Sequence, residues 1–114
     1  MTRVALSPAQ RREIARGRFV RIGPAMDSVL VGRVEGVWTA YRNVCRHRAL
    51  PLDLGASSPM SDDGRYLLCH QHGALYRVDD GKCVVGPCVG ERLERVAVKG
   101  GEEGEEGEGE IEVG

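Results

Sequence analysis

The chain has 114 residues, a formal net charge of −1 and a hydrophobic content of 41%, which is ordinary for one globular domain. It contains no run of apolar residues long enough to span a membrane, and its N-terminus has no secretory signal pattern, so we expect a cytoplasmic protein without membrane contact. In that reducing compartment its four cysteines are expected to be metal ligands or free thiols rather than a disulfide framework.

The charge is unevenly distributed along the chain. Residues 100–114 carry seven Glu and no Lys or Arg, which leaves sixteen basic and ten acidic residues on positions 1–99, a formal charge of +6. The basic residues follow no nucleic-acid-binding motif, so no nucleic-acid partner is expected. An acidic protein partner and a merely solvated basic surface both remain open.

The N-terminal region predicts one short helix, at about residues 8–16. Ser7 has the character of an N-cap, Pro8 suits the first helical turn, and Gln10 completes a capping box. Gly17 is available to end the helix.

The remainder of the chain predicts a mainly β fold with antiparallel strands in a single domain over residues 1–114. The expected strands are short, β-rich runs separated by Gly and Asp, at Phe19–Ile22, Ser28–Val31, Val37–Tyr41, Tyr66–Leu68, Leu75–Val78 and Leu93–Val98. Residues 55–64 have no apolar period and are expected to form a surface loop.

The acidic C-terminal stretch, residues 100–110, has two interpretations. Repeated Glu and Gly favour a disordered tail, because like charges repel and glycine adds chain entropy. However, Ile111 and Val113 alternate with Glu112, which favours a closing hairpin between about Leu93–Lys99 and Glu110–Val113, with the acidic run at its tip.

Two short motifs carry metal-type ligands. Cys45 and His47 form a CxH motif, and Cys69 and His72 form a CxxH motif, with twenty-one residues between His47 and Cys69. Two extended loops of this kind can each supply one sulfur and one nitrogen to one [2Fe–2S] cluster. If both thiolates bind one iron and both imidazoles bind the other, the cluster is easier to reduce than an all-Cys cluster, at about −150 to +300 mV.

Other interpretations of these residues exist. Each Cys, taken alone, suits a buried thiol, and each His suits a surface or hydrogen-bonded position. A structural zinc site accepts the same ligand set, although zinc spacings usually begin with CxxC. His70 lies next to Cys69 and is expected to be an exposed loop residue rather than a ligand.

The runs NVCRHRALPLDLG (residues 43–55) and LLCHQHGALYRVDDGKCVVGPCVGERLERVAV (residues 67–98) resemble the cluster-binding loops and following hairpin of Rieske proteins, above all the small Rieske ferredoxins of bacterial oxygenases. The resemblance spans Phe19 to Val113. It implies a Rieske-like antiparallel β-sandwich with a cluster-binding subdomain at about residues 43–90. It also implies one [2Fe–2S] cluster per chain, held by Cys45, His47, Cys69 and His72.

The resemblance also bears on the reduction potential. High-potential respiratory relatives carry a disulfide between the two loops, where this chain has Leu50 and Gln71. They also carry a serine that donates to a cluster sulfide, where this chain has Ala74. Because hydrogen bonds to sulfur stabilise the added electron, we expect a potential in the lower part of the Rieske range. Tyr76 is either a hydrogen-bond donor to a cysteine sulfur, as in the family, or a plain core residue.

Cys83 and Cys88 remain after the ligands are assigned. Four residues separate them across the Gly86–Pro87 turn, so either a disulfide or two small buried thiols would fit.

The implied function is electron transfer without catalysis. The chain is too short to include the catalytic domain of a Rieske oxygenase, so we expect an electron carrier between a flavoprotein reductase and a terminal oxygenase. Arg46 and Arg48 flank His47, where they either steer an acidic partner or only hold the loop. The alternatives are a subunit of a larger enzyme, such as the nitrite reductase small subunit, and a zinc-binding interaction module.

Overall fold

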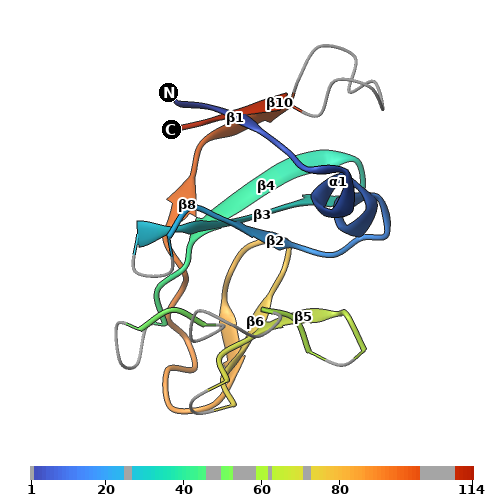
Figure 1. Cartoon of the computed structure of the whole chain (residues 1–114). Coiled ribbons are helices and arrows are strands. Elements are labelled where there is room, and N and C mark those ends of the chain that lie inside the picture. Colours follow the sequence, from blue (N-terminus) through green and yellow to red (C-terminus); the bar gives the residue numbers. More distant parts are fainter. Residues whose placement is uncertain are drawn as a thin grey trace.

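The computed structural model describes residues 2–24, 27–45, 50–52, 59–61, 63–70, 73–100 and 110–114. Its strands are all antiparallel and form three sheets, and one short helix packs beside them. Figure 1 shows both termini at one end of the molecule, beside β1 and β10, whereas β5 and β6 lie at the opposite end. The predicted fold class, mainly β with one N-terminal helix, is confirmed.

The three sheets follow one another along the molecule. The first has the order β1 (Thr2–Ala5), β10 (Glu110–Val113) and β9 (Val98–Gly100). The second has the order β2 (Val20–Ile22), β3 (Val29–Val34), β4 (Val37–Arg42) and β8 (Arg95–Val96). The third has the order β5 (Tyr66–Leu68), β6 (Leu75–Arg77) and β7 (Cys83–Val85).

Helix α1 (Pro8–Ala15) begins as the sequence predicts. The Ser7 hydroxyl accepts from the Gln10 backbone N–H at 3.1 Å, and the Gln10 side-chain oxygen accepts from the Ser7 N–H at 2.8 Å. This reciprocal pair satisfies two amides that have no partner within the helix. Ile14 is the buried residue of the helix, and the chain leaves it through Gly17, whose φ of 85° favours glycine.

The closing hairpin of the C-terminus is confirmed for its second strand, whereas the first strand, predicted at about Leu93–Lys99, is divided into β8, which pairs with β4, and β9, which pairs with β10. Strand β10 pairs with β9 through Ile111 opposite Gly100 and Val113 opposite Val98. The alternative of a wholly disordered tail is therefore wrong for residues 110–113, while residues 101–109 lie outside the described residues. Strand β1, which pairs with the other edge of β10, was not predicted from the sequence, because a mostly exposed strand of four residues has little apolar pattern.

The buried side chains form two separate cores. We call the first the sulfur core, since it holds all four cysteines; it consists of Phe19, Leu30, Tyr41, Cys45, Leu52, Met60, Leu67, Cys69, Ala74, Tyr76, Cys83, Cys88 and Leu93. We call the second the aliphatic core; it consists of Leu6, Ile14, Val20, Val31, Ala40, Ile111 and Val113.

The expectation of a surface loop at residues 55–64 is wrong for Met60. This side chain is only 3% exposed and forms an isolated β-bridge with Leu67 in the sulfur core. Pairing with Leu67 of β5 holds this apolar side chain in the core. Such a contact between distant residues cannot be predicted from the polar residues that surround Met60 in the sequence. Most of the remaining loop residues lie outside the described residues. No described helix is long and apolar enough to cross a membrane.

Candidate metal centre

The first motif lies in a loop that begins directly after β4. The Cys45 N–H donates to the Leu50 carbonyl at 2.7 Å, which closes the loop at its base. Asn43 reinforces it from within the core, because its side-chain oxygen accepts from the Leu52 N–H at 2.8 Å and its amide donates to Ser28 Oγ at 3.1 Å. A buried amide with both ends hydrogen-bonded is costly to move, so the position of Cys45 is fixed.

The second motif lies in the connection between β5 and β6. The Cys69 N–H donates to the Ala74 carbonyl at 2.9 Å, and the Gly73 N–H donates to the Cys69 carbonyl at 2.8 Å. The His70 N–H donates to the Leu52 carbonyl at 2.9 Å, and this bond ties the second loop to the first. The two loops therefore hold a fixed position relative to one another.

The cysteine sulfurs of both loops are buried in one core. Cys45 is 1% exposed and Cys69 is fully buried, and none of the four cysteines forms a disulfide. The Tyr76 hydroxyl lies 3.5 Å from the Cys45 sulfur and 3.0 Å from the Cys88 sulfur. Tyr76 is also fully buried. Its side chain therefore contacts a cysteine sulfur and packs in the core at the same time, so the two expectations for this residue are compatible.

A third loop, at Gly86 and Pro87, lies against the second. Gly86 has φ of 110°, and a Cβ there would lie 2.9 Å from the Ala74 Cα. Only glycine fits so close to the backbone of another loop at that φ. The loop therefore covers Ala74, and two side chains near it, Val85 and Val89, are 48% and 61% exposed.

The structure places part of the predicted ligand set. Cys45 and Cys69 come together in the sulfur core, whereas His47 and His72 lie outside the described residues, as do Arg46, Arg48 and Gln71. The described residues alone assemble no group of three or more metal-type ligands. His70 is exposed, as predicted.

The donor chemistry fits a [2Fe–2S] cluster. Two buried cysteine sulfurs stand at the bases of two loops that share a hydrogen bond, and the CxH and CxxH motifs place one further histidine in each loop, with His70 as an additional histidine in the second. Soft thiolate ligands favour iron–sulfur clusters and zinc over hard cations. The stabilising role of Asn43 and Ser28 was not predicted from the sequence, where the available signal was an Asn two residues before the first motif.

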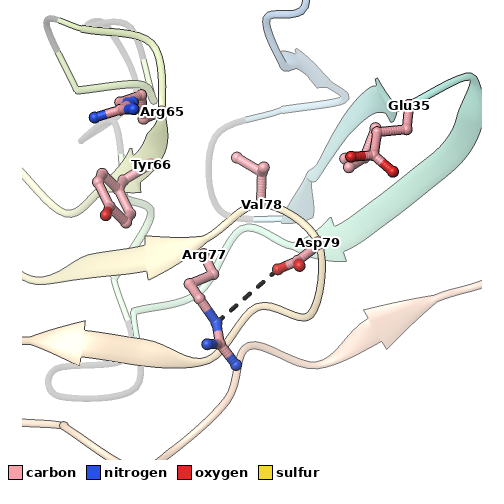
Figure 2. Close-up of a pocket in the computed structure, with 7 residues that line it drawn as sticks. Glu35, Arg65, Tyr66, Arg77, Val78 and Asp79 are labelled. Carbon is pink, nitrogen blue, oxygen red and sulfur yellow. Dashed lines mark ion pairs between the residues drawn. The ribbon is translucent and has the colours of Figure 1, made fainter.

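A separate hollow of about 650 Å³ lies on the surface between the β3–β4 turn and the third sheet. Figure 2 shows Glu35, Arg65 and Arg77 around it, with an ion pair of 4.0 Å between Arg77 and Asp79. Neither Cys45 nor Cys69 lines this hollow. It is thus a charged surface feature distinct from the candidate metal centre.

A comparison with protein families shows the family of the chain. Residues 6–99 match the model of the Rieske [2Fe-2S] domain, so the chain belongs to this family. Its cofactor is accordingly a [2Fe–2S] cluster. Family membership displaces the alternative of a zinc site. A comparison with curated proteins gives no match.

Solved structures extend this result. The terminal oxygenase of carbazole 1,9a-dioxygenase from Nocardioides aromaticivorans IC177 is 27% identical, with a TM-score of 0.58 over 78% of this chain and 25% of that chain. A chain in the complex of reduced oxygenase and oxidized ferredoxin in carbazole 1,9a-dioxygenase is 26% identical, with a TM-score of 0.57 over 86% of this chain and 89% of that chain.

The ferredoxin of carbazole 1,9a-dioxygenase from Nocardioides aromaticivorans IC177 has the same fold. Its TM-score is 0.62 at 22% identity, over 99% of this chain and 97% of that chain. This chain therefore spans about a quarter of the matched oxygenase chain and nearly the whole of the ferredoxin.

Proposed function

We propose that this chain is a single-electron carrier of the ferredoxin type, not a catalyst, and that Cys45, His47, Cys69 and His72 hold its cluster. The observation that carries this proposal is the burial of Cys45 and Cys69 in one core, on two loops tied by the His70–Leu52 hydrogen bond. When bound, a [2Fe–2S] cluster accepts and releases one electron without bond rearrangement.

The protein residues supply rigidity and a dry environment for this exchange. The amides of Cys45 and Cys69 close their own loops, so both sulfurs stay in place when the charge of the centre changes. Leu52, Leu67 and Ala74 are fully buried in the same core, and they exclude water from the two sulfurs. A site that needs no rearrangement suits rapid electron transfer.

We further propose that the partners are a flavoprotein reductase and a terminal oxygenase. The similarity to a chain from an oxygenase–ferredoxin complex supports this choice. The exposed Val85 and Val89 beside the third loop offer an apolar contact surface, and Arg46 and Arg48 would add positive charge that steers an acidic partner.

The reduction potential is proposed to lie in the lower part of the Rieske range. Ala74 is buried beside the second loop and has no hydroxyl to donate to a sulfur, so one source of stabilisation for the added electron is missing. Voltammetry tests this, and a potential equal to that of the respiratory Rieske proteins would contradict it.

Anaerobic stopped-flow spectroscopy tests the carrier role. The holoprotein is mixed with NADH and a flavoprotein reductase, and then with the oxidised terminal oxygenase of a carbazole 1,9a-dioxygenase. We expect reduction by one electron per chain, followed by reoxidation that is faster in the presence of the oxygenase and slows as salt is added. Reoxidation at the same rate with and without the oxygenase would contradict the proposed partner.

A further inference from the structure

Cys83 and Cys88 form a close pair of buried thiols. Cys83 is fully buried, Cys88 is 3% exposed, and their sulfurs lie 2.9 Å apart. The backbone fixes this approach, since the Cys83 N–H donates to the Glu91 carbonyl at 2.8 Å and the Glu91 N–H donates to the Cys88 carbonyl at 2.9 Å. A disulfide bond of about 2.05 Å would need a movement of less than an ångström.

The pair is connected to the candidate metal centre through one hydroxyl group. Tyr76 has a single phenolic proton, and two sulfurs lie within reach of it, Cys88 at 3.0 Å and Cys45 at 3.5 Å. The shorter contact is the one to Cys88. The state of Cys88 therefore decides how much of this proton is available to Cys45.

We propose that Cys83 and Cys88 are a reversible dithiol–disulfide pair that tunes, through Tyr76, the hydrogen bond to the Cys45 sulfur. The pair itself is independent of the cluster. Its effect on the reduction potential rests on the proposed function, in which Cys45 is a cluster ligand.

A peroxide supplies the oxidising equivalents. The Cys88 thiolate attacks one peroxide oxygen and the O–O bond breaks, which gives a sulfenic acid and, after uptake of a proton, water. The Cys83 sulfur then attacks the Cys88 sulfur, its proton leaves with the hydroxyl as a second water, and the S–S bond forms. Two thiols and hydrogen peroxide thus give one disulfide and two waters, and a dithiol reductant reverses the change by exchange.

The order of attack follows from burial. Burial, together with the neighbouring Cys88, raises the pKa of the Cys83 thiol to about 12, so Cys83 keeps its proton. Cys88 retains some exposure and is the sulfur that a small oxidant reaches first. Because that exposure is small, we expect slow oxidation.

Disulfide formation redirects the Tyr76 proton. Closing the S–S bond shifts the Cys88 sulfur and removes its thiol proton, which alters its contact with the phenol and favours the other sulfur in contact with it, that of Cys45. Hydrogen bonds to a cluster ligand sulfur favour the reduced state. The disulfide form should therefore have a higher reduction potential than the dithiol form.

The test compares both thiol states of the holoprotein. The protein is treated with one equivalent of hydrogen peroxide, the intact mass is measured, the visible spectrum is used to verify the cluster, and the potential is determined by voltammetry. We expect loss of two hydrogen atoms and a shift of up to about tenfold in the ratio of reduced to oxidised cluster at fixed potential, which equals 59 mV for a one-electron couple. A dithiol should restore both values.

Three variants separate the steps. The Cys88→Ser variant should lose no hydrogen atoms on oxidation and show no shift in reduction potential. If Cys88→Ser does not fold, Cys83→Ala tests the same step. The Tyr76→Phe variant should still form the disulfide, and so lose two hydrogen atoms on oxidation, but its reduction potential should not shift.

The outcomes distinguish this inference from the proposed function. A holoprotein that keeps both hydrogen atoms refutes the redox pair, and a disulfide without any shift in the wild-type protein refutes the coupling through Tyr76. A protein that forms the disulfide but carries no cluster contradicts the proposed function and leaves the redox pair supported.

Discussion

The two cores of the molecule differ in what they bury. The buried side chains of the aliphatic core come from Leu, Ile, Val and Ala, so they stabilise the packing of the helix and the terminal strands by apolar contact. The sulfur core contains four cysteines and the hydroxyl groups of Tyr41 and Tyr76, so it combines packing with directed polar contacts. All four cysteine sulfurs and the hydroxyl groups of two buried tyrosines thus lie in one core, which is the core proposed to hold the cofactor.

The largest difference between the cores should appear when a cluster ligand is removed. Cys69→Ala is expected to abolish the cluster altogether, because the remaining ligand set cannot complete the coordination of its iron. Iron and acid-labile sulfide analysis with the visible spectrum measures this. The matched control is Cys83→Ala, which removes an equally buried sulfur from the same core and should retain the cluster.

Truncation of the aliphatic core should cost stability but leave the cofactor unchanged. Ile111 is 1% exposed, and Ile111→Ala should lower the free energy of unfolding by about 2–5 kcal/mol through lost burial and a cavity. Denaturant unfolding measures the loss.

The control for this truncation is Leu67→Ala in the sulfur core. It should cause a similar loss of stability and also change the reduction potential, since Leu67 shields the sulfurs. An equal change of potential in both variants would mean that the cores are not separate.

Tyr41 should make the sulfur core sensitive to alkali. Its hydroxyl donates to the Val78 carbonyl at 2.8 Å, and burial raises its pKa to about 12 although the nearby Arg95 guanidinium lowers it. The folded protein then holds this proton more tightly than the unfolded chain, whose pKa is about 10. The stability from this group is fully present below pH 10 and is lost as the pH rises toward 12.

Tyr41→Phe removes both effects. The variant should be less stable by about 1–3 kcal/mol at neutral pH, because a partly buried carbonyl loses its donor. It should also lack the Tyr41 contribution to the fall in stability between pH 10 and 12. Urea unfolding at several pH values measures both, and an unchanged slope in the variant would refute the assignment.

The smallest expected effect belongs to the helix beside the aliphatic core. Ser7→Ala removes the side-chain acceptor of the capping box and should lower the free energy of unfolding by about 1 kcal/mol. The cluster content should not change. Ser7→Asp keeps an acceptor at the N-cap and should restore the stability, whereas a failure to do so would show that the cap contributes through another contact.

The sequence was informative where a local pattern determines the structure. The capping box at Ser7, the alternation at Ile111 and Val113, and the CxH and CxxH motifs were all sufficient for correct elements or a correct family. Each of these signals lies within a few residues and reflects a period or a ligand spacing.

Long-range pairing could not be predicted in this way. Strand β1 exists because its backbone pairs with β10 at the other end of the chain, and Met60 is buried because it bridges Leu67. The contact of Tyr76 with Cys88 depends on the turn of the third loop. The two histidine ligands remain a prediction, because His47 and His72 lie outside the described residues.

The measurement that tests the central claim most directly is nitrogen hyperfine spectroscopy of the reduced protein, together with its iron and sulfide content. We predict two irons and two sulfides per chain, with two distinct histidine nitrogen couplings, of which one disappears in His47→Cys and the other in His72→Cys. A reduced cluster without histidine nitrogen couplings, or a colourless protein that contains zinc, would contradict the account.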